Sequence, residues 1–148
     1  MDSYRPQIII GSESWLDDSI SNNEVFPPDF NAFRKDRVHG NDSRGGVFVA
    51  LRNDIIGTHQ VDYDTDCEVI WVQIQLVGCK NIVIGAFYRP PSLDDPDYLE
   101  RLRTSLSRIN TSNGTVIALG GDFNLGDINW DNCSVPTGAK KVALSELL

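Results

Sequence analysis

Two long runs of β-branched and aromatic residues stand close together in the middle of the chain. Residues 67–76 alternate between polar and apolar side chains in their second half, and residues 81–88 are nearly all apolar. Runs of this length and composition are typical of strands. Only residues 77–80 separate them, which is a length suited to a hairpin loop. The two runs therefore predict an antiparallel hairpin.

Other apolar runs predict further strands on both sides of this hairpin. They are short, rich in β-branched or aromatic side chains and bounded by polar or glycine-bearing segments, and they cover residues 7–11, 29–34, 46–52 and 115–120. The runs at 7–11 and 115–120 are apolar enough to predict buried strands. Mixed strands with few helices indicate an α+β or α/β sandwich whose core is made by sheets.

One helix is predicted between the hairpin and the last strand. Apolar residues recur there at the three- and four-residue steps of one helix face, at Leu99, Leu102, Leu106 and Ile109. Asp95 suits the N-cap and Pro96 the first helical position, and the helix is expected to fray near residues 113–114. A second helix is expected from Lys140 to the end of the chain.

Composition narrows the class of protein. The chain has 148 residues, 41% of them hydrophobic, which is enough for one compact domain. No apolar run approaches the ~20 residues of a membrane-spanning helix, so we expect an intracellular protein. The formal net charge of −8 argues against binding nucleic acid through bulk positive charge. It does not exclude a metal-dependent nuclease, which gathers carboxylates around a cation.

The cysteines and histidines suggest structural positions. Three cysteines are an odd number without metal-ligand spacing, so we expect half-buried apolar roles for them and neither a disulfide framework nor a zinc site. His39 lies in a polar loop and His59 precedes a short β run, and we assign both to the surface.

Polar side chains follow three of the predicted strands. Glu13 comes after the first strand, Tyr88 and Arg89 end the hairpin, and Asp122 and Asn124 follow the last strand in a glycine-bearing segment. Asp can orient or deprotonate a water, Asn can donate to a phosphate oxygen, and Glu is a ligand that Mg²⁺ prefers. A phenol and a guanidinium can contact phosphate. Each pattern alone also has a structural interpretation. Asp122 and Asn124 could belong to a turn whose side chains bond its own backbone, Glu13 could be a solvated loop residue, and Tyr88 and Arg89 could mark the end of a strand.

In combination, these patterns resemble the endonuclease/exonuclease/phosphatase superfamily. Residues 121–124 match its Gly-Asp-x-Asn motif, Glu13 stands where the family has its metal-binding Glu, and Tyr88 stands where it has a phosphate-contacting Tyr. The endonuclease domains of non-LTR retrotransposons are the branch that the chain resembles in its further segments, which are residues 12–16, 33–37, 43–47 and 88–91.

The resemblance implies a deoxyribonuclease-I-like, two-sheet α/β sandwich and a set of roles. Glu13 would hold Mg²⁺ or Mn²⁺, Asp122 would align or activate the attacking water, and Asn124 would position the water or the phosphate. Tyr88 would bind the scissile phosphate. Arg89 is a candidate for contacts with the DNA backbone.

Arg44 is a second candidate for DNA contacts, and Asp127 lies near enough in sequence to Asn124 to line the same cleft.

Residues 1–148 are expected to form one partial domain, because the family's first strand with its metal-site Asn and its C-terminal Ser-Asp-His segment have no counterpart in the sequence. The resemblance therefore implies an incomplete site.

The leading hypothesis is a magnesium-dependent phosphodiesterase that nicks DNA, weakly or not at all as this chain. It would act in the nucleus, without membrane association, and its parent element could encode a reverse-transcriptase domain. Two alternatives stay open. The chain could be a non-catalytic remnant of the same fold, or it could act on a phosphoinositide or another phosphoester.

Overall fold

The computed structural model describes residues 5–37, 44–76, 78, 80–91, 97–112, 114–126, 128–129, 131–132 and 134. Several sequence-based predictions lie outside these residues. They concern the N-cap at Asp95 and Pro96, the second helix from Lys140, and the positions of His39, Asp127, Cys79 and Cys133.

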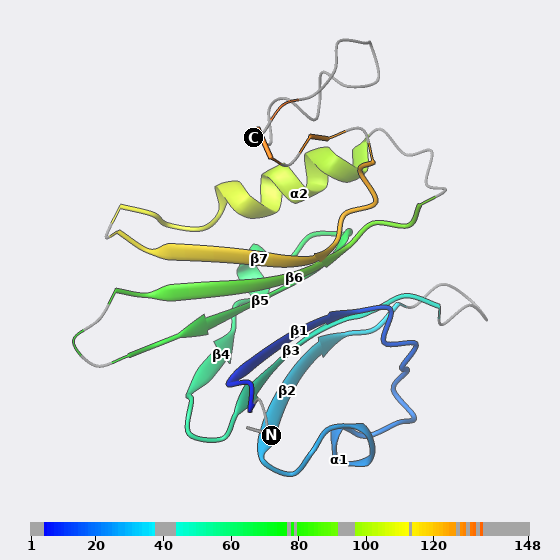
Figure 1. The fold of residues 1–148 in the computed structure, drawn as a ribbon, viewed down its shortest axis with the longest axis vertical. Helices are drawn as coiled ribbons and strands as arrows, with labels where there is room; N and C mark the ends of the chain where they lie inside the picture. The colour runs from blue at the N-terminus through cyan, green and yellow to red at the C-terminus, as the bar shows by residue number, and fades with distance from the viewer. Residues whose placement is uncertain are drawn as a thin grey trace.

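Two sheets face each other and form a sandwich (Figure 1). The three-stranded sheet has the order β1-β3-β2 and is antiparallel, with β1 at Ile8–Ser12, β2 at Phe30–Lys35 and β3 at Val47–Arg52. The four-stranded sheet has the order β4-β5-β6-β7, with β4 at Gly57–His59, β5 at Glu68–Ile74, β6 at Ile82–Tyr88 and β7 at Val116–Asp122. The remaining elements are α1 (Asn22–Val25), the short 3-10 helix η1 (Val61–Tyr63) and α2 (Asp97–Ser107). The predicted two-sheet α/β sandwich is confirmed.

The predicted hairpin is also confirmed. Strands β5 and β6 pair antiparallel, from Glu68 opposite Tyr88 to Ile74 opposite Ile82. Both strands are almost entirely buried, because one face of their sheet meets the other sheet and the opposite face meets α2. Burial on both faces explains why residues 81–88 read as a continuous apolar run.

The main core lies between the two sheets. It is built from the inward-facing side chains of the central strands of each sheet, namely Val47, Val49, Leu51, Ile70, Val72, Ile74, Ile84, Ala86 and Tyr88. Alternate residues of β3 and β5 enter this core, as the two-residue period of a strand requires. Tyr88 is the one member with a polar group, and it stands at the end of its strand.

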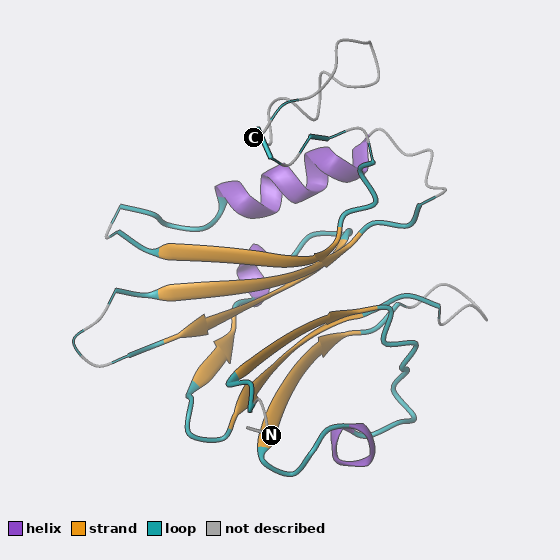
Figure 2. Cartoon of the chain, in the orientation of Figure 1, coloured by secondary structure: helices purple, strands orange, loops and turns teal. Residues whose placement is uncertain are grey.

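Helix α2 covers the outer face of the four-stranded sheet (Figure 2). Tyr98, Leu102 and the following Ile109 pack there against Trp71 and Phe87. The helix lies on the crossover from β6 to β7, and a crossover of this kind allows the two strands to run parallel. No helix among the described residues is long and apolar enough to cross a membrane.

The helix ends earlier than its apolar spacing predicts. Its last residue is Ser107, and Ile109 is buried in the turn that follows. Two bonds of the tighter i to i−3 kind form this turn, from the N–H of Arg108 to the carbonyl of Ser105 and from the N–H of Ile109 to that of Leu106. The chain turns here because it must return to the start of β7.

Strand β7 differs from the prediction of a buried strand. Among the described strands it pairs only with β6, so it forms an edge of the sheet. Ile117 and Leu119 pack towards α2, whereas Val116 is 48% exposed and Ala118 is also exposed. β1 is likewise half-buried at an edge, and not a buried strand. An apolar run alone cannot separate a central strand from an edge strand.

Two single-residue predictions also need correction. Cys67 is fully buried, which raises the pKa of its thiol, and is therefore more enclosed than the half-buried position expected. His59 belongs to β4 and is only partly exposed, with its Nε2 2.9 Å from a carboxylate oxygen of Asp64. Its place between a strand and η1 explains this partial burial.

Ser105 joins α2 to the sheet and supplies a test of this packing. Its buried hydroxyl accepts a hydrogen bond of 2.7 Å from Nε1 of Trp71 and donates to the carbonyl of Tyr63. Ser105→Ala should lower the free energy of unfolding by about 1–3 kcal/mol, because two buried polar groups lose their partner. Urea unfolding followed by circular dichroism measures this change. The control is Ser107→Ala on the exposed side of α2, which should change the free energy by about 0.5 kcal/mol or less.

Candidate active site

Three strands end together at one end of the sandwich. β1, β6 and β7 end at Ser12, Tyr88 and Asp122, and their ends lie on the same side in Figure 1. Tyr88 and Asp122 are direct register partners in the parallel pair. β1 crosses closely over β7, since a Cβ added at Gly120 would lie 3.1 Å from Cδ1 of Ile10. Residues that are more than 100 positions apart in sequence are therefore neighbours here.

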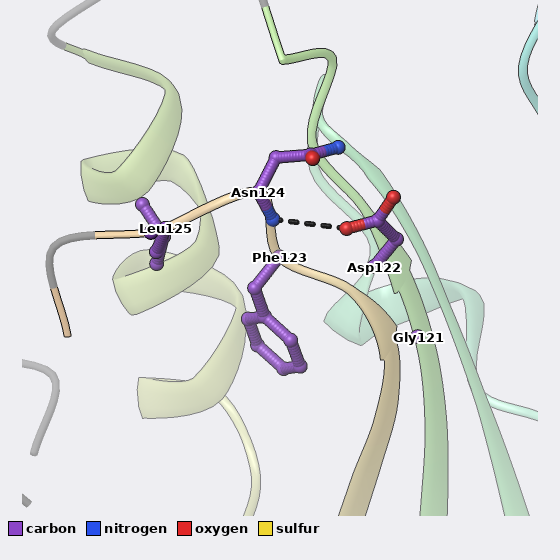
Figure 3. A pocket seen from close by; sticks show the side chains of 6 residues that line it. Gly121, Asp122, Phe123, Asn124 and Leu125 are labelled. Carbon is purple, nitrogen blue, oxygen red and sulfur yellow. Dashed lines mark hydrogen bonds between the residues drawn. The ribbon is translucent and has the colours of Figure 1, made fainter. Parts of the chain in front are cut away.

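Asp122 and Asn124 form a tight turn at the end of β7. The backbone N–H of Asn124 donates to Oδ1 of Asp122 at 3.0 Å, and Asn124 has a positive φ of 47° (Figure 3). A turn whose Asp side chain bonds its own backbone is the purely structural interpretation of this motif. The Asp122 residue is nevertheless exposed, so the turn fixes its carboxylate without hiding it.

The turn lines an open pocket. Its wall is formed by residues 121–126, and its volume is about 590 Å³. In Figure 3 the polar groups of Asp122 and Asn124 lie on one side, and Leu125 lies towards α2. Phe123 packs its ring 5.1 Å from that of Phe87 and anchors the turn to the outer core. A carboxylate and an amide are thus held at the edge of an accessible space.

Arg89 and Asn124 hold each other in place. Nδ2 of Asn124 donates to the carbonyl of Arg89 at 2.7 Å, and Nη1 of Arg89 donates to the carbonyl of Asn124 at 3.2 Å. The N–H of Arg89 also donates to the carbonyl of Asp122 at 2.9 Å. The parallel pairing of β6 with β7 thereby continues into the turn, and it places the Arg89 guanidinium beside the pocket.

Glu13 meets Tyr88 at the same end of the sandwich. Glu13 is exposed, whereas Tyr88 is only 6% exposed, and the Glu13 carboxylate interacts with the Tyr88 phenol. Burial, and then this carboxylate, raise the pKa of Tyr88 to about 12. The phenol beside Glu13 therefore stays protonated at neutral pH. Glu13 does not belong to the wall of the Asp122 pocket, so the structure brings these residues to one end without enclosing them in one cavity.

Arg37 and Glu68 complete this end of the site, and the sequence analysis assigned no role to either. Glu68 lies opposite Tyr88 in the β5–β6 pair and accepts hydrogen bonds from Nε of Arg37 at 2.7 Å and from the N–H of Gly46 at 2.6 Å. The Arg37 guanidinium lies 5.5 Å from the centre of the Tyr88 ring. A glutamate at the start of a largely apolar strand was the available signal, because a largely buried charge requires a partner.

Arg44 is exposed and also lies at this end. It directly precedes Gly45, whose carbonyl accepts a hydrogen bond of 2.9 Å from the N–H of Trp15, two residues after Glu13. The predicted DNA-contacting roles of Arg44 and Arg89 stay predictions, as do the catalytic roles of Asp122, Asn124 and Tyr88.

The donor atoms suit a hard divalent cation held by few protein ligands. Mg²⁺ in proteins usually takes one or two carboxylates and keeps several waters. An exposed carboxylate such as that of Glu13 fits that pattern. Within the described part of the chain there is no cluster of three or more His, Cys, Asp and Glu side chains that could enclose a metal. The role of Glu13 as a metal ligand therefore stays a prediction. A cation bound there would have few protein ligands and would keep several waters.

Comparison with known structures identifies the fold. The chain superposes on the endonuclease domain of TRAS1, a telomere-specific non-LTR retrotransposon, with a TM-score of 0.50 and 20% sequence identity. The chain has the fold of a retrotransposon endonuclease domain. The match covers 68% of this chain and 42% of the TRAS1 chain, so the chain spans less than half of that endonuclease domain. No protein-family profile and no curated protein sequence matches the chain.

The coupling between Glu13 and Tyr88 can be measured directly. Glu13→Gln removes a negative charge beside the phenol, so the pKa of Tyr88 should fall from about 12 towards, but not to, the ordinary value of about 10. Burial of the ring keeps the remaining elevation. NMR titration of ¹³C-labelled tyrosine rings measures the shift. Glu100→Gln, which changes an exposed side chain on α2, should leave this pKa unchanged, and an equal fall in both variants would contradict the contact.

Proposed function

We propose that this chain is a divalent-metal-dependent phosphodiesterase of the retrotransposon-endonuclease type, and that its substrate is DNA. One observation carries the proposal. Glu13, Tyr88, Asp122 and Asn124 stand at the ends of three separate strands or within two residues after them, at one end of a sandwich that has an endonuclease fold. As parts of the same proposal, the activity on DNA would lie in the nucleus and the parent element could encode a reverse-transcriptase domain.

Glu13 is assigned to metal binding, and Asp122 and Asn124 are assigned to the water and the phosphate. Glu13, beside the phenol of Tyr88, would hold Mg²⁺ or Mn²⁺, and a bound cation would neutralise charge on the phosphate and on the leaving oxygen. Asp122 presents an exposed carboxylate that can align a water and accept its proton. Asn124 is fixed through its amide nitrogen by the carbonyl of Arg89, which sets the position of its side chain at the pocket edge.

Electrostatics restrict how DNA would be held. With a formal net charge of −8, the protein as a whole repels a polyanion. Arg89 and Arg44 would supply local positive charge at the end of the sandwich where Glu13 and Asp122 lie. Binding that rests on a few arginines and one cation should be weak and should involve few phosphates, so its salt dependence should be shallow.

A second function is supported by a specific observation. Asp122 and Asn124 already bond within their own turn and to Arg89, as they would in a purely structural motif. A non-catalytic protein that keeps the fold and binds through it would show the same bonds. The two functions differ in whether phosphodiester cleavage depends on Asp122.

Conversion of supercoiled plasmid to its nicked form, with Mg²⁺ or Mn²⁺ present, tests the proposal. We expect slow nicking that stops with a chelator and that Asp122→Ala lowers by about 10²- to 10³-fold, the usual effect of removing one preorganised catalytic group. Asp62→Asn changes another exposed carboxylate, in η1, and should leave the rate unchanged.

Two results of this assay would overturn the proposal. Equal, metal-independent rates for wild type and Asp122→Ala would show that the site is not catalytic, and the non-catalytic alternative would then hold. Release of phosphate from an inositol polyphosphate, without nicking, would move the substrate to another phosphoester.

Metal binding provides an independent prediction. Calorimetric titration of Mn²⁺ into the wild-type protein should show weak binding that Glu13→Gln greatly reduces, because one carboxylate supplies much of the site's charge. Glu24→Gln, which changes an exposed glutamate in α1, is the matched control and should bind as wild type does. Superimposable isotherms for wild type and Glu13→Gln would remove Glu13 from the metal site.

A further inference from the structure

Trp15 is held in solvent beside the candidate site. Its residue is 56% exposed, whereas Trp71 in the core is fully buried. A tryptophan has the largest apolar surface of any side chain, so exposing it is unfavourable unless a ligand covers it. Trp15 lies two residues after Glu13, on the loop that follows β1.

The loop fixes this outward position. Glu13 and Trp15 both have positive φ angles, 54° and 56°, which are uncommon for side chains of these types. The N–H of Trp15 donates to the carbonyl of Gly45 at 2.9 Å, and the next residue, Leu16, is buried at 8% exposure. The hydrogen bond to Gly45 and the buried Leu16 hold this uncommon backbone conformation in place. Backbone conformations of this kind cluster at ligand-binding sites.

The segment that faces the loop of Glu13 and Trp15 requires glycine at two positions. Gly45 and Gly46 have φ angles of 128° and 84°, and a Cβ at Gly46 would lie 2.6 Å from Oγ of Ser14. A Cβ at Gly45 would lie 2.6 Å from Cζ of Arg37. The glycine pair therefore allows the β1 loop to approach the start of β3, and this approach positions both Glu13 and Trp15.

The neighbours of Trp15 indicate the chemistry of its ligand. The carboxylate of Glu13 lies two residues before Trp15 in sequence, and the exposed Arg44 adjoins the glycine that bonds the Trp15 backbone. An exposed aromatic side chain with an arginine on the neighbouring segment suits single-stranded nucleic acid, in which the base stacks on the ring and the arginine neutralises a phosphate.

A protein partner fits the surroundings less well. Among the described residues, the other large exposed hydrophobic side chains include Ile56 before β4 and Val116 at the start of β7, which lie at the opposite ends of their sheets from Trp15. A docking surface for a protein would need a contiguous apolar patch. Ile56 and Val116 therefore form no such patch with Trp15.

We propose that Trp15 is a stacking platform for an unpaired base of the nucleic-acid substrate, adjacent to the phosphate that would be bound near Glu13. The inference deepens the proposed function and rests on it for the position of the scissile phosphate. In a regular duplex each base is covered by its neighbours, so a platform of this kind selects single strands, gaps or distorted duplexes.

Fluorescence titration with a short single-stranded oligodeoxynucleotide, in Mg²⁺ and completed before the slow cleavage proceeds, tests the platform. Stacking should quench tryptophan emission in the wild type and leave emission of Trp15→Phe nearly constant. Trp15→Ala should weaken binding about 5- to 100-fold without changing the slope of affinity against salt concentration, since it removes no phosphate contact. Arg44→Ala should instead reduce that slope. Ile56→Ala, the most exposed apolar side chain named above, is the matched control and should bind as wild type does.

The outcomes separate this inference from the proposed function. If Trp15→Ala binds the oligonucleotide as wild type does, or if the blunt duplex of the same sequence binds as tightly as the single strand, the platform is overturned. Retained circular dichroism and thermal unfolding of Trp15→Ala show that any loss is local. Because the titration needs no catalysis, Trp15-dependent binding by a protein that does not nick plasmid would overturn the endonuclease proposal and leave the platform standing.

Discussion

The parallel pairing of β6 with β7 is the constraint on which the candidate site depends. It places Tyr88 directly opposite Asp122, and it continues beyond the strands through the N–H of Arg89 to the carbonyl of Asp122. Antiparallel partners joined by a short turn would have put these two residues at opposite ends of the sheet. The pairing requires a crossover, which α2 supplies, and the burial of α2 against Trp71 and Phe87 stabilises both the sheet and the site at its end.

A second set of contacts links this helix to the Glu13 side. The hydroxyl of Tyr98, on the first turn of α2, accepts a hydrogen bond from the N–H of Glu68 at 2.9 Å and donates to the carbonyl of Tyr88 at 2.8 Å. It thus bridges the end of the β5–β6 ladder, where Glu68 also holds Arg37 and the N–H of Gly46. The helix, both sheets and the Glu13 loop are joined through a few charged and phenolic groups. Every buried polar group in such a network must keep its partner, so the network specifies one arrangement of the strand ends.

The acidic charge of the protein and the chemistry proposed for it are compatible for a physical reason. Carboxylates at a strand end repel a phosphate until a cation intervenes, and the cation then reverses the local field. Arginines at the same end of the sandwich supply positive charge against this background. Arg37 is paired with Glu68 inside the fold, and Arg44 lies at the surface. Arg37 therefore helps to hold the strand ends together, and Arg44 is the arginine that we propose for contact with a phosphate.

The sequence by itself predicted six of the seven strands that the structure describes, the hairpin, helix α2 and the motif at residues 121–124, because strand alternation, helix spacing and turn chemistry are local properties. It did not predict the short elements α1, β4 and η1. It also indicated that Glu13, Tyr88 and Asp122 follow strand ends. Only the tertiary structure decided that these ends meet, that β7 is an edge, that Arg37 and Glu68 support Tyr88, and that Trp15 is held outward against Gly45. These features depend on which strands become neighbours and on contacts across 30 or more residues of sequence, and no local pattern encodes such contacts.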